Sequence, residues 1–451
     1  MGTHERETTQ EPSTPGSRHR SGQTGKSFPV ETLCQMHIYA ASYLLPINGS
    51  PLEGGAVVVE KGLIRAVDKL AVLRKKFSAP VHEFPGAVLM PGLVNAHTHL
   101  ELTHFPEWLN KGGLDTSCYP YVEWVMQVIQ IKRQVGYEDL CASLLEGFRL
   151  SIQSGTTMVG DILSERQLIP LYENSQLAGR LYLEFIGQDP LRYTPILASM
   201  DHDISLLPGH FHPGISPHAP FTVSAKLLQA LLSLARSRKI PLTMHLAESA
   251  EEGSFYHDST GGIAESLYPF VGWGEFLPVP LAMTSTVWLE LSSALSADFL
   301  AVHGVQLTSA DIALLRDRGA SVVLVPRSNH NLAVGKAPVK ELLQAGIPLS
   351  LGTDSLASSD SLSLWDEMRF LLDVFPQSFS PGDALRMATI GGARAIQRDH
   401  EAGTLEPGKR ADFIVMETGN KTTAGNICEQ LVEDSKVSGV WCGGEKVWGC
   451  D

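Results

Sequence analysis

The sequence lacks the marks of several large classes of protein. No apolar run approaches the ~20 residues that cross a bilayer, so we expect no membrane-spanning helix. The six cysteines include no C-x-x-C pair, which argues against a zinc ribbon and against a disulfide framework. Lys and Arg form no cluster of the kind that displaces counterions from phosphates, so we expect no nucleic-acid partner.

Acidic residues outnumber basic ones by 49 to 35, which gives a formal net charge of −14. The chain has 451 residues, 43% of them apolar, and can therefore bury a large core. These totals favour an acidic enzyme that acts on a small molecule. They leave its oligomeric state open, with a homo-oligomer among the alternatives.

The first residues are polar as far as Lys26 and lack the apolar centre of a signal peptide. We therefore predict a disordered tail over residues 1–27 and a cytoplasmic location. The histidines of this segment, His4 and His19, are expected to be exposed to solvent and without function.

Both ends of the remaining chain have the pattern of short strands joined by tight turns. Near the N-terminus, Asn48-Gly49 and Lys61-Gly62 separate apolar runs, and such dipeptides are typical of β-turns. The same pattern returns after Gly403. We predict one small β-sandwich domain assembled from residues 28–88 and 404–451.

The middle of the chain, residues 89–403, alternates short apolar runs with helical patterns, for example over residues 225–238 and 310–317. Eight runs qualify as strands: residues 88–99, 156–162, 180–186, 214–218, 241–248, 299–303, 321–326 and 348–354. Alternating strands and helices predict a parallel sheet, and eight such units close a (β/α)8 barrel of the TIM type.

Histidines and one aspartate mark the ends of these predicted strands. His97 and His99 follow one apolar run, and His245, His303 and Asp354 each end another. The C-terminal ends of barrel strands meet at one face, where barrel active sites lie. Residues i and i+2 of a strand point the same way, so His97 and His99 can bind one metal ion together. One such histidine alone is more often a hydrogen-bonded core residue, but their joint placement favours a metal site.

Glu248 lies three residues beyond His245, just past the end of its predicted strand. A carboxyl group there can shuttle protons over the reacting atoms, which contributes about 10²–10⁴ in rate. The alternative is a glutamate at the start of a helix, where the helix dipole favours negative charge.

Four motifs in this order resemble those of the amidohydrolase superfamily. They are residues 91–100 (PGLVNAHTHL), 245–248 (HLAE), 302–304 (VHG) and 351–355 (LGTDS). More narrowly, they resemble the aminohydrolase (deaminase) branch, which also holds chlorohydrolases. The resemblance covers nearly the whole chain, including the divided β domain and the turn at residues 406–412 (EPGKRAD).

The resemblance implies a role for each residue of the site. These roles are metal ligation by His97, His99, His245 and Asp354, proton transfer by Glu248 and Asp354, polarisation of the attacking water by His303, and substrate contact by His218. In the implied mechanism the ion lowers the pKa of its bound water from 15.7 to roughly 7. Glu248 protonates the ring nitrogen beside the attacked carbon and then the departing amine, which leaves as ammonia.

The resemblance also bears on the number of metal ions. Members with two ions usually carry a carboxylated lysine at the end of strand four, where this chain has residues 214–218 (GISPH). One divalent ion is therefore expected. Three imidazoles and a carboxylate suit Zn²⁺, with Fe²⁺ and Mn²⁺ as alternatives.

Three further residues are candidates for substrate contacts. Glu101 follows the His-Thr-His-Leu motif and can hydrogen-bond a polar substrate edge. Trp108 can stack on a heteroaromatic ring, as can Tyr121 and Trp124 nearby, although such aromatic residues are more often core. Arg327 follows the seventh predicted strand and can pair with a substrate carboxylate, with a structural salt bridge as the alternative.

The runs HTHLEL, SPHAP, HLAES and PRSN together resemble the aminodeoxyfutalosine deaminases of menaquinone biosynthesis. Their substrate is an adenine nucleoside that bears a benzoate, which would give Arg327 a partner. The S-adenosylhomocysteine/methylthioadenosine deaminases come next, followed by guanine deaminases and chlorohydrolases. A cyclic amidohydrolase and a non-catalytic homologue remain as alternatives. The absent lysine weighs against the former, and the complete set of inferred site residues against the latter.

Overall fold

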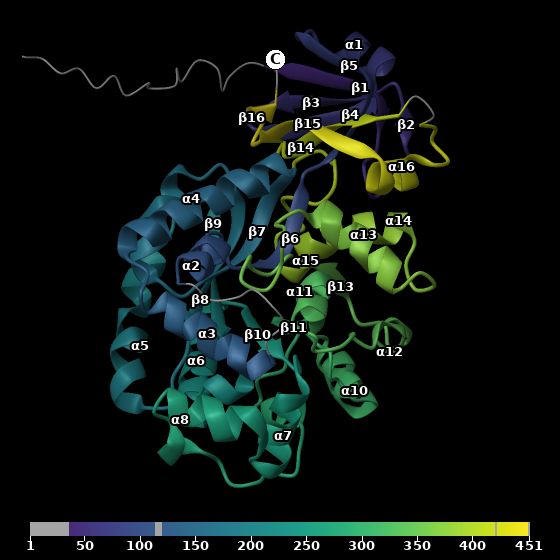
Figure 1. Cartoon of the computed structure of the whole chain (residues 1–451). Coiled ribbons are helices and arrows are strands. Elements are labelled where there is room, and N and C mark those ends of the chain that lie inside the picture. Colours follow the sequence, from purple (N-terminus) through teal and green to yellow (C-terminus); the bar gives the residue numbers. More distant parts are fainter. Residues whose placement is uncertain (1–35, 113–119, 420–421, 450–451) are drawn as a thin grey trace, which may run out of the picture.

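The largest element of the molecule is a ring of eight parallel strands (Figure 1). The computed structural model describes residues 36–112, 120–419 and 422–449. The ring follows chain order and consists of β6 (Leu93–Thr98), β7 (Thr156–Leu163), β8 (Ala178–Phe185), β9 (Phe211–Pro217), β10 (Leu242–Leu246), β11 (Phe299–His303), β12 (Ser321–Leu324) and β13 (Leu349–Leu351). The predicted (β/α)8 barrel is thus confirmed.

The ring closes where β13 meets β6. Thr98 and Asp354 form a parallel bridge, and the backbone N–H of Asp354 donates to the carbonyl of His97 at 3.1 Å. Gly352 permits this approach, because a Cβ there would lie 2.7 Å from the carbonyl oxygen of His97. Closure therefore places the predicted site residues of the first and last strands next to each other.

Seven of the eight predicted strands match strands of the ring to within a few residues at their ends. The prediction of one continuous strand over residues 88–99 is wrong, because the chain forms β5 (Val81–Pro91) and β6 there, in different sheets. Gly92 lies between them, and a Cβ at this position would lie 2.2 Å from Oγ1 of Thr157. The glycine thus lets the chain pass from one sheet to the other.

The second sheet is mixed and combines strands from both ends of the described chain, as predicted. Its order is β16-β15-β14-β5-β1-β3-β4, with β2 beside β1. The bounds are β1 (His37–Leu44), β2 (Leu52–Glu53), β3 (Gly55–Glu60), β4 (Leu63–Lys69), β14 (Phe413–Thr418), β15 (Ser435–Cys442) and β16 (Glu445–Gly449). The exact division of the chain at residues 88 and 404 stays a prediction.

This mixed sheet curls so that one of its faces encloses a core. Tyr39 of β1 and Trp441 of β15 are three strand positions apart, which corresponds to about 14 Å in a flat sheet. Their ring centroids are nevertheless only 5.7 Å apart, and Phe413 stacks on Trp441 at 4.9 Å. One face of this single mixed sheet therefore carries the core of the small domain.

Helices surround the ring, and two more, α1 and α16, lie against the mixed sheet (Figure 1). They are α1 (Leu70–Lys76), α2 (Phe105–Lys111), α3 (Tyr121–Lys132), α4 (Tyr137–Gln153), α5 (Pro190–Ser205), α6 (Ala225–Arg238), α7 (Ala250–Asp258), α8 (Tyr268–Phe270), α9 (Ser285–Leu291), α10 (Ser309–Arg318), α11 (Pro326–Asn331), α12 (Val339–Gln344), α13 (Leu364–Val374), α14 (Pro381–Arg386), α15 (Gly392–Ala395) and α16 (Ile427–Glu433). The helix predicted over residues 225–238 is α6. It begins where Ser224 accepts a hydrogen bond from the backbone N–H of Leu227, and it buries Leu227 and Leu231.

The mixed sheet packs against the ring at the start of its strands. Gly155 immediately precedes β7, and a Cβ there would lie 3.2 Å from Cδ1 of Ile414 and 3.3 Å from Cγ2 of Val437. Figure 1 shows the mixed sheet at the top of the molecule, together with α1 and α16. The opposite end of the ring, where the predicted site residues lie, is left free of this sheet.

Some predictions concern residues outside the described ranges. The predicted tail over residues 1–27 and the first part of the small domain over residues 28–35 lie outside these ranges. So do Cys34, Cys118 and Cys450, three of the six cysteines for which no disulfide framework is expected. In the part of the chain that the structure describes, no helix is both long and apolar enough to cross a membrane.

Candidate functional site

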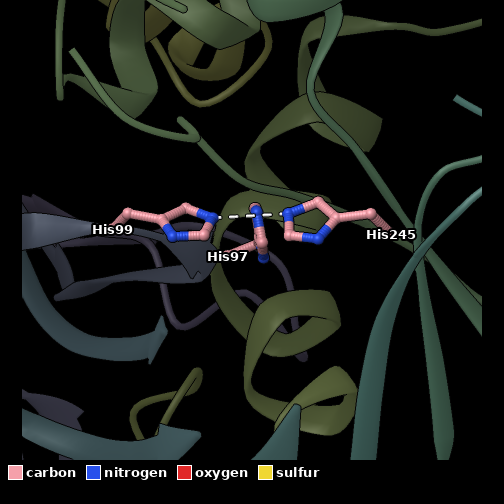
Figure 2. A group of neighbouring side chains, drawn as sticks. All are labelled: His97, His99 and His245. Atoms are coloured by element: carbon pink, nitrogen blue, oxygen red, sulfur yellow. Dashed lines mark hydrogen bonds between the residues drawn. The ribbon is translucent and has the colours of Figure 1, made fainter. Parts of the chain in front are cut away.

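Three histidines meet at the C-terminal end of the ring (Figure 2). His97 lies in β6, His99 just beyond it, and His245 in β10. The Nε2 atoms of His99 and His245 are 3.3 Å apart, and the ring of His97 stands edge-on with its centroid 5.0 Å from each of theirs. One nitrogen from each histidine lies within 4.8 Å of the other two, close enough to share an ion.

The protonation of these histidines leaves nitrogen lone pairs available. Nδ1 of His245 lies 2.8 Å from the carbonyl oxygen of His218, so Nδ1 carries the proton and Nε2 is free. Both ring nitrogens of His97 are buried and have no hydrogen-bond partner in the described part of the chain. Burial lowers the pKa of His97 and lowers those of His99 and His245 well below the usual value. All three imidazoles are therefore neutral at pH 7.

Asp354 supplies an oxygen beside these nitrogens. Its Oδ1 is 3.7 Å from Nε2 of both His97 and His99, while its Oδ2 accepts hydrogen bonds from Ser328 at 2.7 Å and Ser358 at 2.8 Å. Burial alone would raise the pKa of Asp354, but the histidines, above all His97, hold it well below the usual value. Three neutral imidazoles and one carboxylate are the donor set of a zinc site, so the residues present fit a divalent ion.

Three of the strands end in the same unusual way at this site. At the end of each strand a residue other than glycine has a positive φ. The values are 51° for Ala247 after β10, 71° for His303 in β11 and 58° for Asp354 after β13. Residues other than glycine adopt this left-handed conformation at a cost of about 1–3 kcal/mol each. Such strain persists where surrounding contacts enforce it, and it clusters at functional sites.

Glu248 lies beside the histidine cluster, in the loop between β10 and α7. Its Oε2 accepts a hydrogen bond from the hydroxyl of Tyr121 at 2.8 Å, and its Oε1 is 3.6 Å from Nε2 of His303. Burial, followed by the charge of Asp354, raises the pKa of Glu248 to about 8. The carboxyl group is therefore protonated at neutral pH, as a proton donor must be.

His303 is fully buried and is oriented by one neighbour. Its Nδ1 lies 2.9 Å from Oδ1 of Asn329, and this oxygen accepts a hydrogen bond from the Nδ1–H group. Its Nε2 is buried and has no hydrogen-bond partner among the residues that the structure describes, and burial lowers the pKa of His303. The neutral ring thus presents a free acceptor to the space beside Glu248.

These groups open into a cavity of about 180 Å³. Its polar wall includes Glu101, Lys132, Glu184, His218, Thr222 and Ser355, and its apolar wall includes Leu102, Tyr121, Trp124, Val125, Val128, Ile129, Ile186, Leu267, Val271 and Trp273. Nδ1 of His218 lies 3.1 Å from the hydroxyl of Thr222, and burial lowers the pKa of His218 to about 4. The predicted substrate contacts Glu101 and His218 therefore share one cavity with the histidine cluster, as do Tyr121 and Trp124.

Two predicted substrate contacts lie elsewhere. Trp108, in α2, is buried in the main hydrophobic core, which is the alternative that the sequence left open for it. Arg327, in α11, pairs with Asp360, with Asp366 at 3.5 Å and with Glu367 at 3.9 Å, and does not line the cavity. Three carboxylates already surround this guanidinium, so the structural salt bridge describes Arg327 better than a substrate contact does.

Lys132 and Glu184 line the cavity and were not predicted. Glu184 lies at the C-terminal end of β8, so the rule that identified His245 applies to it as well. Lys132 belongs to α3, and no strand pattern points to it. Its Nζ donates to Glu101 at 2.5 Å and to Ser164. Burial alone would raise the pKa of Glu101, but Lys132 lowers it below the usual value.

Comparison with known proteins gives a consistent result. The Amidohydrolase family matches residues 88–447. The chain is 30% identical over 362 residues to an aminodeoxyfutalosine deaminase from Deinococcus radiodurans, a match that covers 78% of this chain and 83% of that protein. It is also 30% identical over 395 residues to a 5-methylthioadenosine/S-adenosylhomocysteine deaminase from Syntrophobacter fumaroxidans, covering 82% and 81% respectively. Among solved structures, a zinc-bound adenosine deaminase from Xanthomonas campestris superposes with a TM-score of 0.75 at 27% identity, covering 92% of this chain and 93% of that one.

Proposed function

The chain belongs to the amidohydrolase family, and we propose that it deaminates an adenine-type nucleoside by metal-dependent hydrolysis. The observation that carries this proposal is the meeting of three neutral histidines, Asp354 and a protonated Glu248 beside one cavity. The three similar proteins described above are named deaminases, which supports ammonia as the leaving group and an adenine nucleoside as the substrate.

We assign His97, His99, His245 and Asp354 as the ligands of one divalent ion, with Zn²⁺ as the ion that suits this donor set best. A bound zinc ion supplies a Lewis acid, which makes a water molecule acidic enough to react at neutral pH. The hydrogen bonds from His245 to the carbonyl of His218 and from two serines to Asp354 hold the ligands in place.

Glu248 is proposed as the proton carrier. Because its Oε2 accepts from Tyr121, its proton resides on Oε1, on the side of His303. Glu248 gives this proton to the ring nitrogen beside the carbon that water attacks, and Asp354 takes one proton from that water. Glu248 then passes the second water proton to the departing amine, which leaves as ammonia while the carbonyl forms. The proton held by Asp354 finally restores the protonated form of Glu248, so that an amine is replaced by a carbonyl oxygen.

His303 is proposed to hold the attacking water in line. Its Nδ1–H donates to Asn329, which leaves Nε2 as an acceptor for a water proton next to Glu248. Positioned acceptors of this kind lower the entropic part of the barrier, because the water no longer has to be captured in the right orientation.

The charges of the cavity bear on the choice of nucleoside. Lys132 is the single Lys or Arg among the described residues of the lining, and Glu101 already pairs with it. Arg327, the expected partner for the benzoate of aminodeoxyfutalosine, faces three carboxylates outside the cavity. We therefore propose nucleosides with an uncharged 5′ substituent, such as 5-methylthioadenosine, as the better substrates, with aminodeoxyfutalosine as the alternative.

The test is to purify the protein, to quantify metal by elemental analysis, and to measure ammonia release from a panel. The panel contains adenosine, methylthioadenosine, S-adenosylhomocysteine, aminodeoxyfutalosine, guanine, cytosine and a chlorotriazine. One metal ion per chain and ammonia from an adenine nucleoside are expected. Metal without ammonia from any member would refute the deaminase, and two ions per chain would favour a cyclic amidohydrolase instead.

A further inference from the structure

Glu184 is a buried carboxyl group whose hydrogen bonding is incomplete. It lies at the end of β8, lines the cavity, and is 9% exposed. Its backbone is held in place, because its carbonyl accepts from Nη2 of Arg166 at 2.5 Å. Among the described residues, its Oε1 is nevertheless buried without any hydrogen-bond partner. Buried polar atoms in proteins almost always have a partner, so an unpaired one on a residue that lines a cavity calls for a ligand.

The neighbouring charges do not supply that partner. Lys132 donates to Glu101 and Ser164, and the remaining oxygen of Glu101 accepts from the backbone N–H of Glu165 at 3.2 Å. The Glu101–Lys132 pair is therefore satisfied within the protein, whereas Oε1 of Glu184 is not. The guanidinium of Arg166 also lies near, but it donates to the backbone carbonyls of Leu163 and Glu184. The side-chain carboxyl group of Glu184 therefore remains available to a hydrogen-bond donor of the substrate.

A hydroxyl group is the donor that an adenine nucleoside offers away from its reacting amine. We propose, resting on the proposed deaminase function, that Glu184 is a specificity residue that accepts hydrogen bonds from the sugar hydroxyls of the substrate. Burial raises the pKa of Glu184 to about 7, and a hydroxyl can pair with either form of the carboxyl group. Trp124, Val128 and Trp273 line the same cavity with apolar surface, against which a base can pack.

The experiment compares substrates with and without these hydroxyls in the full-length, metal-loaded protein. The best substrate among adenosine, 5′-deoxyadenosine and methylthioadenosine is paired with its 2′,3′-dideoxy analogue. kcat/KM for both is measured in the wild type and in Glu184→Ala and Glu184→Gln. Glu417→Ala serves as the control, because Glu417 is an exposed strand carboxylate on the mixed sheet. Metal content and melting temperature are recorded for every variant.

Glu184→Ala should lower kcat/KM for the hydroxyl-bearing substrate by about 10- to 100-fold, as expected for a lost hydrogen bond to a charged group. The dideoxy analogue should change by less than about 3-fold, and Glu184→Gln, which keeps an acceptor, should lie between wild type and Glu184→Ala. An equal loss on both substrates would overturn the proposal. If Glu184→Ala does not fold, equal use of the two substrates by the wild type and by Glu184→Gln would overturn it as well.

The two proposals fail in different ways. If no adenine nucleoside yields ammonia with the wild type, the deaminase function itself is refuted, and the role of Glu184 with it. If ammonia is released, but replacing Glu184 changes kcat/KM equally for substrates with and without the sugar hydroxyls, only the role of Glu184 is refuted.

Discussion

Replacing Glu248 by glutamine separates proton transfer from metal binding. Glutamine has nearly the same shape and can still accept the hydrogen bond from Tyr121, but it has no acidic proton to give. Glu248 is not among the four residues proposed as metal ligands, so the metal content of the variant should stay at the wild-type level. Turnover should fall by the contribution of a general acid, about 10²–10⁴ in kcat. That range corresponds to about 3–5 kcal/mol of transition-state stabilisation.

The matched variant is Tyr121→Phe, which keeps the carboxyl group and removes its hydrogen bond. That hydrogen bond lowers the pKa of Glu248, which burial and Asp354 raise to about 8. Without it the pKa should rise further, so the alkaline limb of the pH–kcat profile should move to higher pH. Glu248 must be protonated to act, and activity is expected to fall as pH rises through this pKa.

The assay is steady-state ammonia release with an adenine nucleoside, from pH 6 to 10, alongside metal analysis of each preparation. A Glu248→Gln protein that turns over within about tenfold of the wild type would refute the assignment of Glu248 as proton carrier. Loss of metal together with activity would show instead that Glu248 supports the ion. An unchanged alkaline limb in Tyr121→Phe would show that this limb belongs to another group.

Three further predictions follow from other contacts. Burial raises the pKa of Asp161 from 3.8 to about 7, so the folded state should lose stability as pH rises between these values. Asp161→Asn should then gain up to about 4 kcal/mol over the wild type at pH 8 and little at pH 4, measured by urea unfolding, and an equal gain at both would refute this. Asn329→Ala leaves the Nδ1–H of His303 without its acceptor and should lower kcat by about 10- to 100-fold while metal stays bound; an unchanged kcat would contradict the role of this hydrogen bond. Arg327→Ala should lower stability and reduce kcat/KM to a similar degree for charged and uncharged substrates, whereas a loss confined to carboxylate-bearing ones would restore it as a substrate contact.

The sequence predicted the ring of strands and the clustering of His97, His99 and His245 because both depend on local pattern. Apolar runs of strand length repeat along the chain, and each polar residue of interest stands directly after such a run. In a parallel barrel all strand ends with the same polarity meet at one mouth. Position along each strand is therefore enough to bring residues more than 250 positions apart, such as His97 and Asp354, to 3.7 Å.

The contacts that individual side chains make could not be predicted from the sequence in the same way. Arg327 and Trp108 lie close in sequence to site residues, yet one pairs with Asp360, Asp366 and Glu367 and the other packs in the core. A charge next to a strand end can turn toward the mouth or toward neighbouring helices, and the choice depends on which acidic residues the helices bring near. For Arg327 those residues come from the segment after β13 and from α13.

The sequence by itself predicted the barrel, the clustering of the three histidines and the place of Glu248 beside them, because strand periodicity and strand polarity set which residues reach the mouth of the barrel. Only the tertiary structure decided which residues form the far wall of the cavity. Lys132 comes from α3, a helix outside the barrel strands, and Glu184 draws attention because folding buries its Oε1 without a partner among the described residues. Both features depend on the packing of a helix against strand ends, and no periodicity in the sequence records that packing.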